Sequence, residues 1–371
     1  RGEQVVVVRH GADLAARGDE YALDTTDPDA LDRLLSDLND SARQPQRMVH
    51  MGLLGFEGGE ADYLQRGFYS LLYLGRALGR HCFTADLELI LLSDGLLGAG
   101  DPRVLQPAKA AALGPLRVIP QEYPNIAARA IDVSAGTDPQ TLLAELDAEH
   151  GDSAIALRGA NRWVEDFAPL PLPAPTGVPQ RLREGGTYVI TGGLGNIGLA
   201  LAEYLWQATQ ANIVLTGRVG LPPEDQWPAL AADTDTDELT RQRVDKVMAL
   251  RQAGAEVLVL ATDTADPDAM ERAFTEAEKR FGSVQGVVHA AGLVGEESFA
   301  TIKDCARADC DKQFLPKLGG VAAIEQVLEG RTVDFCALFS SLSPILGGLG
   351  FSAYAAANIC LDAVTERGEG A

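Results

Sequence analysis

Three glycines with a characteristic spacing occur where a hydrophobic run passes into a helical pattern. In Tyr188-Val-Ile-Thr-Gly-Gly-Leu-Gly-Asn-Ile-Gly198 they are Gly193, Gly195 and Gly198, in the order GxGxxG. The first allows a tight turn, the second lets backbone amides approach a pyrophosphate, and the third lets the following helix pack closely, with its N-terminus toward the negative charge. The same pattern occurs in simple tight turns, but here strand and helix signals flank it. The predicted phosphate site comprises Gly192, Gly193, Gly195, Asn196, Ile197 and Gly198.

An arginine occupies the position at which a dinucleotide site selects between cofactors. The next strand-like run ends in Leu215-Thr-Gly-Arg218, and Arg218 lies 20 residues beyond Gly198. NAD sites place a carboxylate there to bind the ribose 2′-hydroxyl, whereas an arginine pairs with a 2′-phosphate. The sequence therefore predicts NADPH as the cofactor. The alternative is a solvated surface arginine.

Small and polar residues follow two later strand-like runs. Asp263 and Thr264 follow the first of these runs, and Asp263 could accept a hydrogen bond from an adenine amino group. His289 is followed by Ala290, Ala291 and Gly292, over which an adenosine could lie. Taken alone, Asp263 could equally be a helix cap, and His289 a satisfied residue at a strand end. We expect these positions to complete the cofactor site: Asp263, Thr264, Ala290, Ala291 and Gly292.

A second group of residues has the chemistry of a proton donor. Ser341 precedes Tyr354 by 13 residues, and Asn358 lies four residues after Tyr354 on the same face of a predicted helix. A phenol is a weak acid at neutral pH, so a nearby cation should stabilise the tyrosinate that forms when Tyr354 gives up its proton. Lys317, on the preceding predicted helix, is the candidate cation. Taken alone, Ser341 could be a turn residue, Tyr354 a half-buried aromatic and Lys317 a solvated helix lysine.

The charge balance and the reactive residue types exclude several functions. The 371 residues include 31 Lys and Arg and 53 Asp and Glu, a net charge of -22. We therefore expect neither nucleic acid nor an anionic membrane as the main partner, because their phosphates would be repelled. No apolar run approaches the roughly 18 residues of a membrane helix. The five cysteines contain no CxxC pair and the five histidines no HExxH motif, so we expect no metal site and a cytoplasmic, reducing environment.

Strand-like and helical runs alternate on both sides of a proline-rich segment, 167–179. This alternation predicts an α/β protein with two Rossmann-like subdomains, residues 1–175 and residues 176–371. Five parallel strands are expected in the second subdomain, a doubly wound sheet, at 187–191, 212–216, 256–261, 286–290 and 334–340. The amino end is not a natural start, and we expect the natural polypeptide to extend beyond both ends of this sequence.

Together these motifs resemble the ketoreductase domains of modular polyketide synthases, which belong to the short-chain dehydrogenase/reductase superfamily. TGGLGNIG, the strand-end arginine, HAAG, the upstream lysine, SSLS and YAAAN occur in that family's order. An asparagine four residues after the tyrosine distinguishes this family from most of the superfamily, which has YxxxK. Four stretches of the amino half resemble the family's catalytically silent structural subdomain, a truncated Rossmann unit. They are 21–38, 48–53, 112–124 and 155–164.

The resemblance implies a reaction and a set of partners. Ser341 would hydrogen-bond a substrate ketone, Tyr354 would protonate its oxygen, Lys317 would stabilise the tyrosinate, and Asn358 would orient the lysine or a proton relay. NADPH would reduce C3 of a β-ketoacyl thioester carried by an acyl carrier protein, usually acidic, and other synthase domains would occupy the same polypeptide. The alternatives are a redox-silent epimerising or structural domain, and a free-standing short-chain ketone reductase.

Compared with the family, this sequence lacks two sequence markers and is expected to lack part of the fold. Residues 294–296 and Leu346 stand where the family has its two stereochemical markers, and neither marker is present. A complete reductase of the superfamily has seven parallel strands and a lid. We therefore expect this chain to lack the last two strands and the lid.

Overall fold

The computed structural model describes residues 4–11, 15–81, 85–148, 151–174, 176–233, 235–293, 295 and 299–368. The chain folds into two compact units. Unit 1 consists of residues 1–168, 295–311 and 340–369. Unit 2 consists of residues 169–294, 312–339 and 370–371. Each unit is described on its own.

The sheet of unit 2 has the strand order of a doubly wound fold. Among the described residues its five strands are β9 (Thr187–Thr191), β10 (Asn212–Gly217), β11 (Val257–Ala261), β12 (Val284–His289) and β13 (Phe335–Leu338). They are all parallel and lie in the order β11-β10-β9-β12-β13. The predicted strands are confirmed to within two residues at each end. The strand order reverses at β9, and in such sheets ligands bind beyond the carboxyl ends of the strands at this point.

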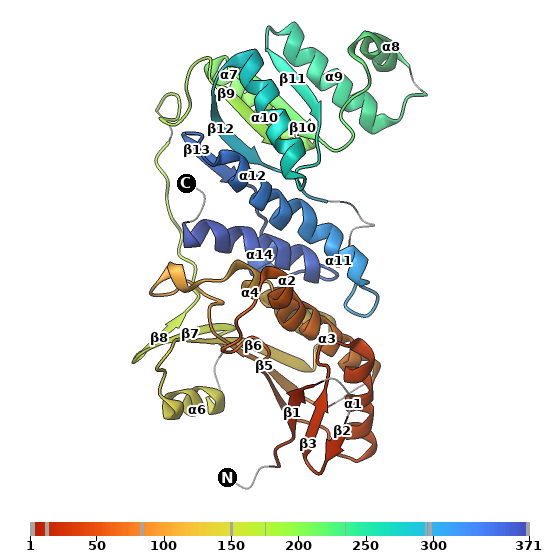
Figure 1. Ribbon diagram of the computed structural model, residues 1–371, viewed down its shortest axis with the longest axis vertical. Coiled ribbons are helices and arrows are strands. Elements are labelled where there is room, and N and C mark those ends of the chain that lie inside the picture. The colour runs from red at the N-terminus through yellow and green to blue at the C-terminus, as the bar shows by residue number, and fades with distance from the viewer. Residues whose placement is uncertain are drawn as a thin grey trace. The chain divides into compact units, whose positions relative to one another are not determined.

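Alternating side chains of β9 supply two apolar layers, one on each face of the sheet. Tyr188 and Ile190 pack into a cluster with α7 (Asn196–Thr209) and α9 (Glu238–Gln252). Val189 packs into a cluster with α10 (Pro267–Phe281) and α12 (Gly320–Leu328). Figure 1 shows α10 lying across one face of this sheet. Because both faces are covered, the strands are almost continuously apolar. The helices of unit 2 are α7 (Asn196–Thr209), η3 (Glu224–Gln226), α8 (Trp227–Ala232), α9 (Glu238–Gln252), α10 (Pro267–Phe281), η5 (Leu315–Gly319) and α12 (Gly320–Leu328).

The main sheet of unit 1 lacks such a reversal. Within the described part of the chain its strands are β4 (Arg47–His50), β5 (Leu87–Ser93), β6 (Ile126–Val133), β7 (Ala154–Arg158) and β8 (Asn161–Val164), paired in that order. The first four are parallel, and β8 runs antiparallel to β7. A second sheet has the order β1-β3-β2, from β1 (Val7–His10), β2 (Ala15–Arg17) and β3 (Glu20–Leu23). The strand-like runs of the amino half, at 5–8, 49–53, 87–92 and 128–133, overlap β1, β4, β5 and β6, whereas the sequence patterns did not identify β2, β3, β7 and β8 as strands.

The helices of unit 1 come from both ends of the chain. From the amino half they are α1 (Pro28–Asp40), α2 (Glu60–Tyr63), η1 (Leu64–Tyr69), α3 (Ser70–Arg80), η2 (Pro102–Val104), α4 (Pro107–Ala110), α5 (Leu113–Glu122) and α6 (Pro139–Asp147). From the carboxyl half they are α13 (Ser343–Leu346) and α14 (Ser352–Arg367). Figure 1 shows α14 beside α4. The helix α11 (Arg307–Phe314) crosses the division between the units.

The chain passes between the units more than once. One crossing lies at residues 168 and 169, inside the proline-rich segment, and others follow residues 294, 311 and 339. Compactness therefore groups α14 with the amino half, whereas the predicted subdomains, residues 1–175 and 176–371, divide the chain at the proline-rich segment. That division stays a prediction about domain organisation.

Candidate active site

The glycine turn after β9 has no room for side chains at three positions. Gly192 has φ +65°, in the left-handed region, and a Cβ added there would lie 2.7 Å from the carbonyl oxygen of Ala290. A Cβ at Gly193 would lie 2.7 Å from the carbonyl oxygen of Ile190, and one at Gly198 would lie 2.5 Å from the Cα of Gly193. Glycine is therefore required for the tight turn and for the close helix packing.

The helix α7 begins directly after this turn, at Asn196. Gly195 is the N-cap and supplies no side-chain hydrogen bond to the first turn, and Asn196 and Ile197 are exposed. The first backbone N–H groups of a helix have no partner within the helix, and they favour an anion. The residues present therefore fit the pyrophosphate of a dinucleotide.

Arg218 and Asp263 lie after the two strands on one side of β9. Arg218 follows β10, is exposed, and makes no hydrogen bond or ion pair with any residue in the described ranges. Asp263 follows β11, and its Oδ1 accepts a hydrogen bond from the backbone N–H of Ala265 at 3.0 Å. Asp263 therefore forms a local turn, whereas the N-cap of α10 (Pro267–Phe281) is Asp266 and not Asp263. The role of Asp263 toward adenine stays a prediction. Thr264 is buried beside it.

Lys317 lies next to the end of β12. Its ammonium is buried and donates a hydrogen bond to the carbonyl oxygen of Phe339 at 2.9 Å. A Cβ at Gly292 would lie 3.3 Å from the Cε of Lys317, so Gly292 borders the lysine. Ala290 and Ala291 connect this point to the glycine turn, since both lie within 3 Å of a Cβ at Gly192.

His289, at the end of β12, is a buried neutral residue. Its Nδ1 is 2.7 Å from the hydroxyl of Thr191 on β9, and its Nε2 has no hydrogen-bond partner among the described residues. Burial, with a smaller contribution from Lys317, lowers the pKa of His289 to about 4. The imidazole is therefore uncharged at neutral pH and adds no positive charge beside the lysine.

Unit 1 holds the other three candidates. The Oγ of Ser341 accepts a hydrogen bond from the backbone N–H of Ser343 at 3.1 Å. Tyr354 is the third residue of α14, and its ring contacts the rings of Phe299 and Phe351 edge-on, with centroids 5.5 Å and 5.6 Å away. No spacing signal in the sequence identified these two phenylalanines.

Asn358 is fully buried one turn after Tyr354. Its Nδ2 donates to the carbonyl oxygen of Tyr354 at 2.8 Å, whereas its Oδ1 has no partner within the described part of the chain. An orphaned buried acceptor costs stability unless a donor reaches it. The acceptor fits a water or a cation, which is the role that the resemblance implies for this residue.

The candidates thus form two groups, each within one compact unit. The cofactor residues and Lys317 belong to unit 2, and Ser341, Tyr354 and Asn358 belong to unit 1. The chain joins the groups directly, because Ser341 follows Phe339, the acceptor for Lys317, by two residues. Leu346 is exposed, and Val294 and Glu296 lie outside the described residues.

Two protein families match this chain. The KR domain family matches residues 186–370, a range that includes every candidate site residue. The chain belongs to this ketoreductase family. A second family, described as beta-ketoacyl synthase-like, N-terminal, matches residues 1–149 of the ketoreductase.

Parts of two known synthases are similar in sequence to this chain, in agreement with its family. The ketoreductase is 32% identical over 267 residues to a 5-methyl-1-naphthoate synthase of Streptomyces sahachiroi, a match that covers 71% of this chain and 14% of the synthase. It is also 32% identical over 260 residues to a 6-methylsalicylic acid synthase of Penicillium patulum, covering 69% of this chain and 14% of that protein. The ketoreductase therefore spans about one seventh of the length of these curated relatives.

Solved structures share its fold. A structure of A-type ketoreductases from a modular polyketide synthase superposes with a TM-score of 0.72 at 26% identity, covering 94% of this chain and 71% of that one. An N-terminal ketoreductase from the macrolactin assembly line gives a TM-score of 0.77 at 24% identity, covering 98% and 71%. These structures confirm the predicted α/β architecture of two Rossmann-like subdomains.

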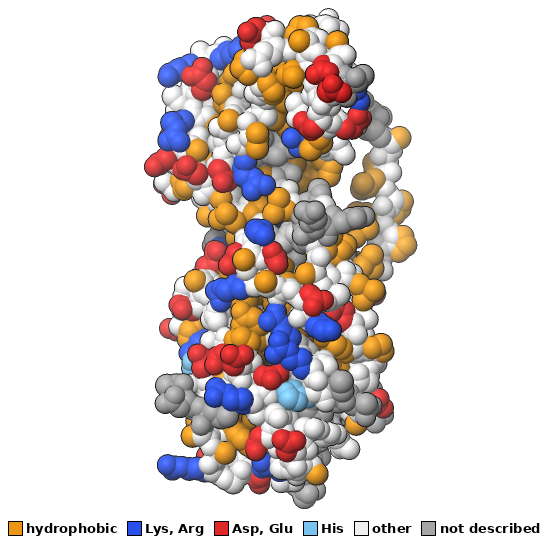
Figure 2. All heavy atoms as spheres, turned by 90° about the vertical axis from the view of Figure 1, so that its right-hand side faces the viewer, with side chains coloured by type: hydrophobic (Ala, Val, Ile, Leu, Met, Phe, Trp, Pro, Cys, Tyr) orange, Lys and Arg blue, Asp and Glu red, His pale blue; other side chains and the backbone are white. Residues whose placement is uncertain are grey.

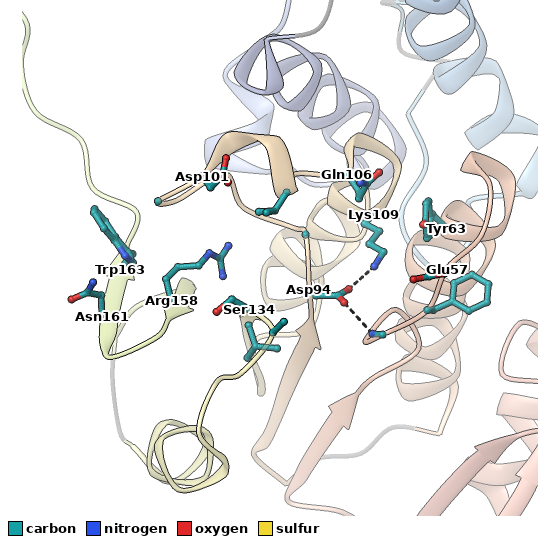
Figure 3. Close-up of a pocket in the computed structure, with 17 residues that line it drawn as sticks. Glu57, Tyr63, Asp94, Asp101, Gln106, Lys109, Ser134, Arg158, Asn161 and Trp163 are labelled. Atoms are coloured by element: carbon teal, nitrogen blue, oxygen red, sulfur yellow. Dashed lines mark hydrogen bonds and ion pairs between the residues drawn. The ribbon is translucent and has the colours of Figure 1, made fainter.

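A pocket of about 660 Å³ lies elsewhere in unit 1, beyond the carboxyl ends of β5 and β6. Figure 3 shows Lys109 pointing at Asp94, and the other oxygen of Asp94 accepts from the backbone N–H of Gly55 at 3.2 Å. Lys109 also donates to the carbonyl oxygen of Leu53, and Arg158 donates to four backbone carbonyls, those of Leu97, Ala99, Asp132 and Leu157. Both cations therefore fasten the pocket wall, and the pocket has none of the residues expected for ketone reduction.

Two further classes of site have no candidate within the described ranges. No group of three or more His, Cys, Asp or Glu residues there could hold a metal ion. None of the helices there has the length and apolar character to cross a membrane.

Proposed function

We propose that this ketoreductase uses NADPH to reduce a β-ketoacyl thioester, carried by an acyl carrier protein, to the β-hydroxyacyl thioester during polyketide elongation. One observation carries the proposal: a member of the ketoreductase family has both a glycine turn with no room for side chains at three positions and an exposed arginine, Arg218, at the end of the next strand. A carboxylate at that strand end would favour NADH, and an arginine favours the 2′-phosphate.

The cofactor is held by backbone in the turn and by charge at its rim. The first-turn N–H groups of α7 bind the pyrophosphate, and the guanidinium of Arg218 pairs with the 2′-phosphate. Ala290 and Gly292 leave space for the adenosine because they carry little or no side chain. When bound, NADPH supplies a hydride to the ketone carbon.

Side chains of the ketoreductase bind and protonate the oxygen of the ketone. The hydroxyl of Ser341 donates a hydrogen bond to it, and the hydroxyl of Tyr354 transfers a proton to it as the carbon is reduced. Lys317 stabilises the resulting tyrosinate by its positive charge. Asn358, through the Oδ1 that has no partner among the described residues, holds the water or ammonium that returns a proton to Tyr354.

The partners follow from the relatives. Their names describe synthases, and this chain spans a small part of them, so we propose that other synthase domains and an acyl carrier protein work with this ketoreductase. The described cysteines are all free, which suits a reducing compartment such as the cytoplasm.

A turnover experiment separates this proposal from its alternatives. The full chain is incubated with NADPH and a β-ketoacyl thioester of pantetheine, and NADPH absorbance and the thioester mass are followed. We expect one β-hydroxyacyl thioester for each NADPH consumed. Exchange of the α-proton for deuterium without loss of NADPH would favour the redox-silent alternative. Equal rates with small free ketones would favour the free-standing reductase.

A further inference from the structure

The loop between α13 and α14 is rich in glycine. Gly347, Gly348 and Gly350 have φ values of +66°, +134° and +77°. Glycine has the most backbone conformations to lose, so ordering such a loop is costly. Leu346 and Leu349 are 65% and 66% exposed, and the loop therefore buries little apolar surface of its own. Two backbone hydrogen bonds within the segment, from Gly347 to Ser343 and from Phe351 to Gly348, are joined by contacts with a neighbouring element.

Gln121, near the end of α5, holds the middle of this loop with both ends of its amide. Its Nε2 donates to the carbonyl oxygen of Leu346 at 2.8 Å, and its Oε1 accepts from the backbone N–H of Gly348 at 3.0 Å. A Cβ at Gly347 would lie 2.5 Å from the amide nitrogen, so the loop needs glycine there for Gln121 to approach. One donor and one acceptor are required, and an amide supplies both.

Glu122 joins the end of the same loop to a second segment. Its Oε1 accepts from the backbone N–H of Gly350 at 3.0 Å, and its Oε2 accepts from the backbone N–H of Ile302 at 2.7 Å. Ile302 is fully buried and lies three residues after Phe299. Two N–H donors need two acceptor oxygens, which a carboxylate has and an amide does not.

The two segments that Gln121 and Glu122 bind, at 346–350 and at Ile302, are each close in sequence to a ring that contacts Tyr354. Gly350 is followed by Phe351, the N-cap of α14, and the rings of Phe299 and Phe351 both contact Tyr354. The same helix, α5, also holds this region at other points. Arg117 donates to the carbonyl oxygen of Pro344, and Gly114 packs against α14.

We propose that Gln121 and Glu122 are positioning residues, which fix the two segments flanking Tyr354 so that its hydroxyl keeps a single position for proton transfer. This inference rests on the proposed function of Tyr354. It gives the amino half of the ketoreductase a part in catalysis through the last two residues of α5. A proton donor displaced by about 1 Å can lose roughly a hundredfold in rate.

Two nearly isosteric exchanges test the inference in the full chain. Glu122→Gln leaves one N–H donor facing an amide nitrogen, and Gln121→Glu sets an oxygen against a carbonyl oxygen. The matched controls are Glu276→Gln and Gln140→Glu, at exposed positions of α10 and α6. For each protein we would measure the folded fraction, the NADPH dissociation constant, kcat, KM and hydrogen exchange in peptides covering residues 300–303 and 346–351.

The expected results distinguish positioning from structural support. Glu122→Gln should lower kcat per folded molecule at least about tenfold, and Gln121→Glu about threefold, because Gln121 is the more exposed. The NADPH dissociation constant should stay within about twofold, since the glycine turn belongs to unit 2. Exchange at residues 350 and 302 should accelerate in Glu122→Gln, and both controls should match the wild-type protein.

Other results would overturn the inference. Unchanged exchange in Glu122→Gln would show that the carboxylate does not hold the two segments. Faster exchange with unchanged kcat would reduce Glu122 to a structural residue. A wild-type protein inactive on β-ketoacyl thioesters would contradict the proposed function and the catalytic part of this inference together, whereas the exchange data would still decide whether the two segments are held.

Discussion

At the scale of single residues, Arg218 is the residue that we propose selects NADPH over NADH. Replacing Arg218 with alanine should weaken NADPH binding by about ten- to a hundredfold, because a charge-assisted pair with the 2′-phosphate is lost. NADH has no such phosphate, and its binding should be nearly unchanged. Fluorescence titration with both cofactors measures the difference, and Arg272→Ala on α10 is a control of equal charge. Equal losses for NADPH and NADH would contradict the assignment.

His289 should make the stability of the ketoreductase depend on pH. Its pKa is about 4 in the folded chain, below the ordinary 6.5 of the unfolded chain. Between these values the unfolded state binds a proton that the folded state does not, so the free energy of unfolding falls as the pH falls. From pH 7 to pH 5 the loss from this residue should be about 2 kcal/mol.

Urea unfolding at pH 7 and pH 5 measures this loss. His50 is also buried, with a pKa of about 4, so the wild-type protein should lose stability through both residues. The variant His289→Gln should lose less between the two pH values, although it starts from a lower stability. The same loss in the wild type and the variant would show that His289 does not control this pH range.

Local chemistry explains why the residues of the glycine turn could be predicted. The turn depends on a strand, three glycines and a helix that adjoin in sequence. Gln121 and Glu122 gave no such signal, because the groups that they bind lie some 180 to 230 residues away and are backbone atoms of any residue type. Their contacts depend on tertiary packing, which spacing in the sequence does not specify.

At the scale of elements, α5 and α14 meet through a glycine. A Cβ at Gly114 would lie 2.6 Å from the Cβ of Ala356 and 2.6 Å from the carbonyl oxygen of Ser352. Gly114→Ala should therefore lower stability by about 2 kcal/mol through overpacking, although alanine favours helix by about 1 kcal/mol. Thermal unfolding measures the sign. A raised Tm would mean that helix propensity dominates and that the two helices are not in close contact.

The strands of unit 2 could be predicted because both faces of their sheet are buried. Continuous apolar runs such as Tyr188–Ile190 then mark each strand clearly. The strands β1, β2 and β8 are short and largely exposed, and β3 has only four residues, of which Tyr21 and Leu23 are buried. Such short strands carry little hydrophobic pattern, so the sequence did not distinguish β2, β3 and β8 from loops.

At the scale of the whole molecule, the net charge of -22 should oppose an acidic carrier protein. Figure 2 shows Asp and Glu interspersed with Lys and Arg on the face in view. Raising the ionic strength from about 0.01 M to 0.15 M shortens the screening length from about 30 Å to about 8 Å. The KM for a carrier-bound substrate should then fall, while the KM for the same acyl group on pantetheine alone should change little. A KM that rises with salt would indicate a basic docking surface.

The central claim is that Tyr354 donates the proton for ketone reduction, and one comparison tests it directly. The single-turnover rate with NADPH and a β-ketoacyl thioester is measured for the wild type, for Tyr354→Phe, and for Tyr204→Phe, which removes a hydroxyl from an exposed position on α7. We predict a loss of about 10² to 10⁴ for Tyr354→Phe, with NADPH affinity retained, and no loss for the control. A Tyr354→Phe rate within about tenfold of the wild type would show that another group protonates the ketone oxygen.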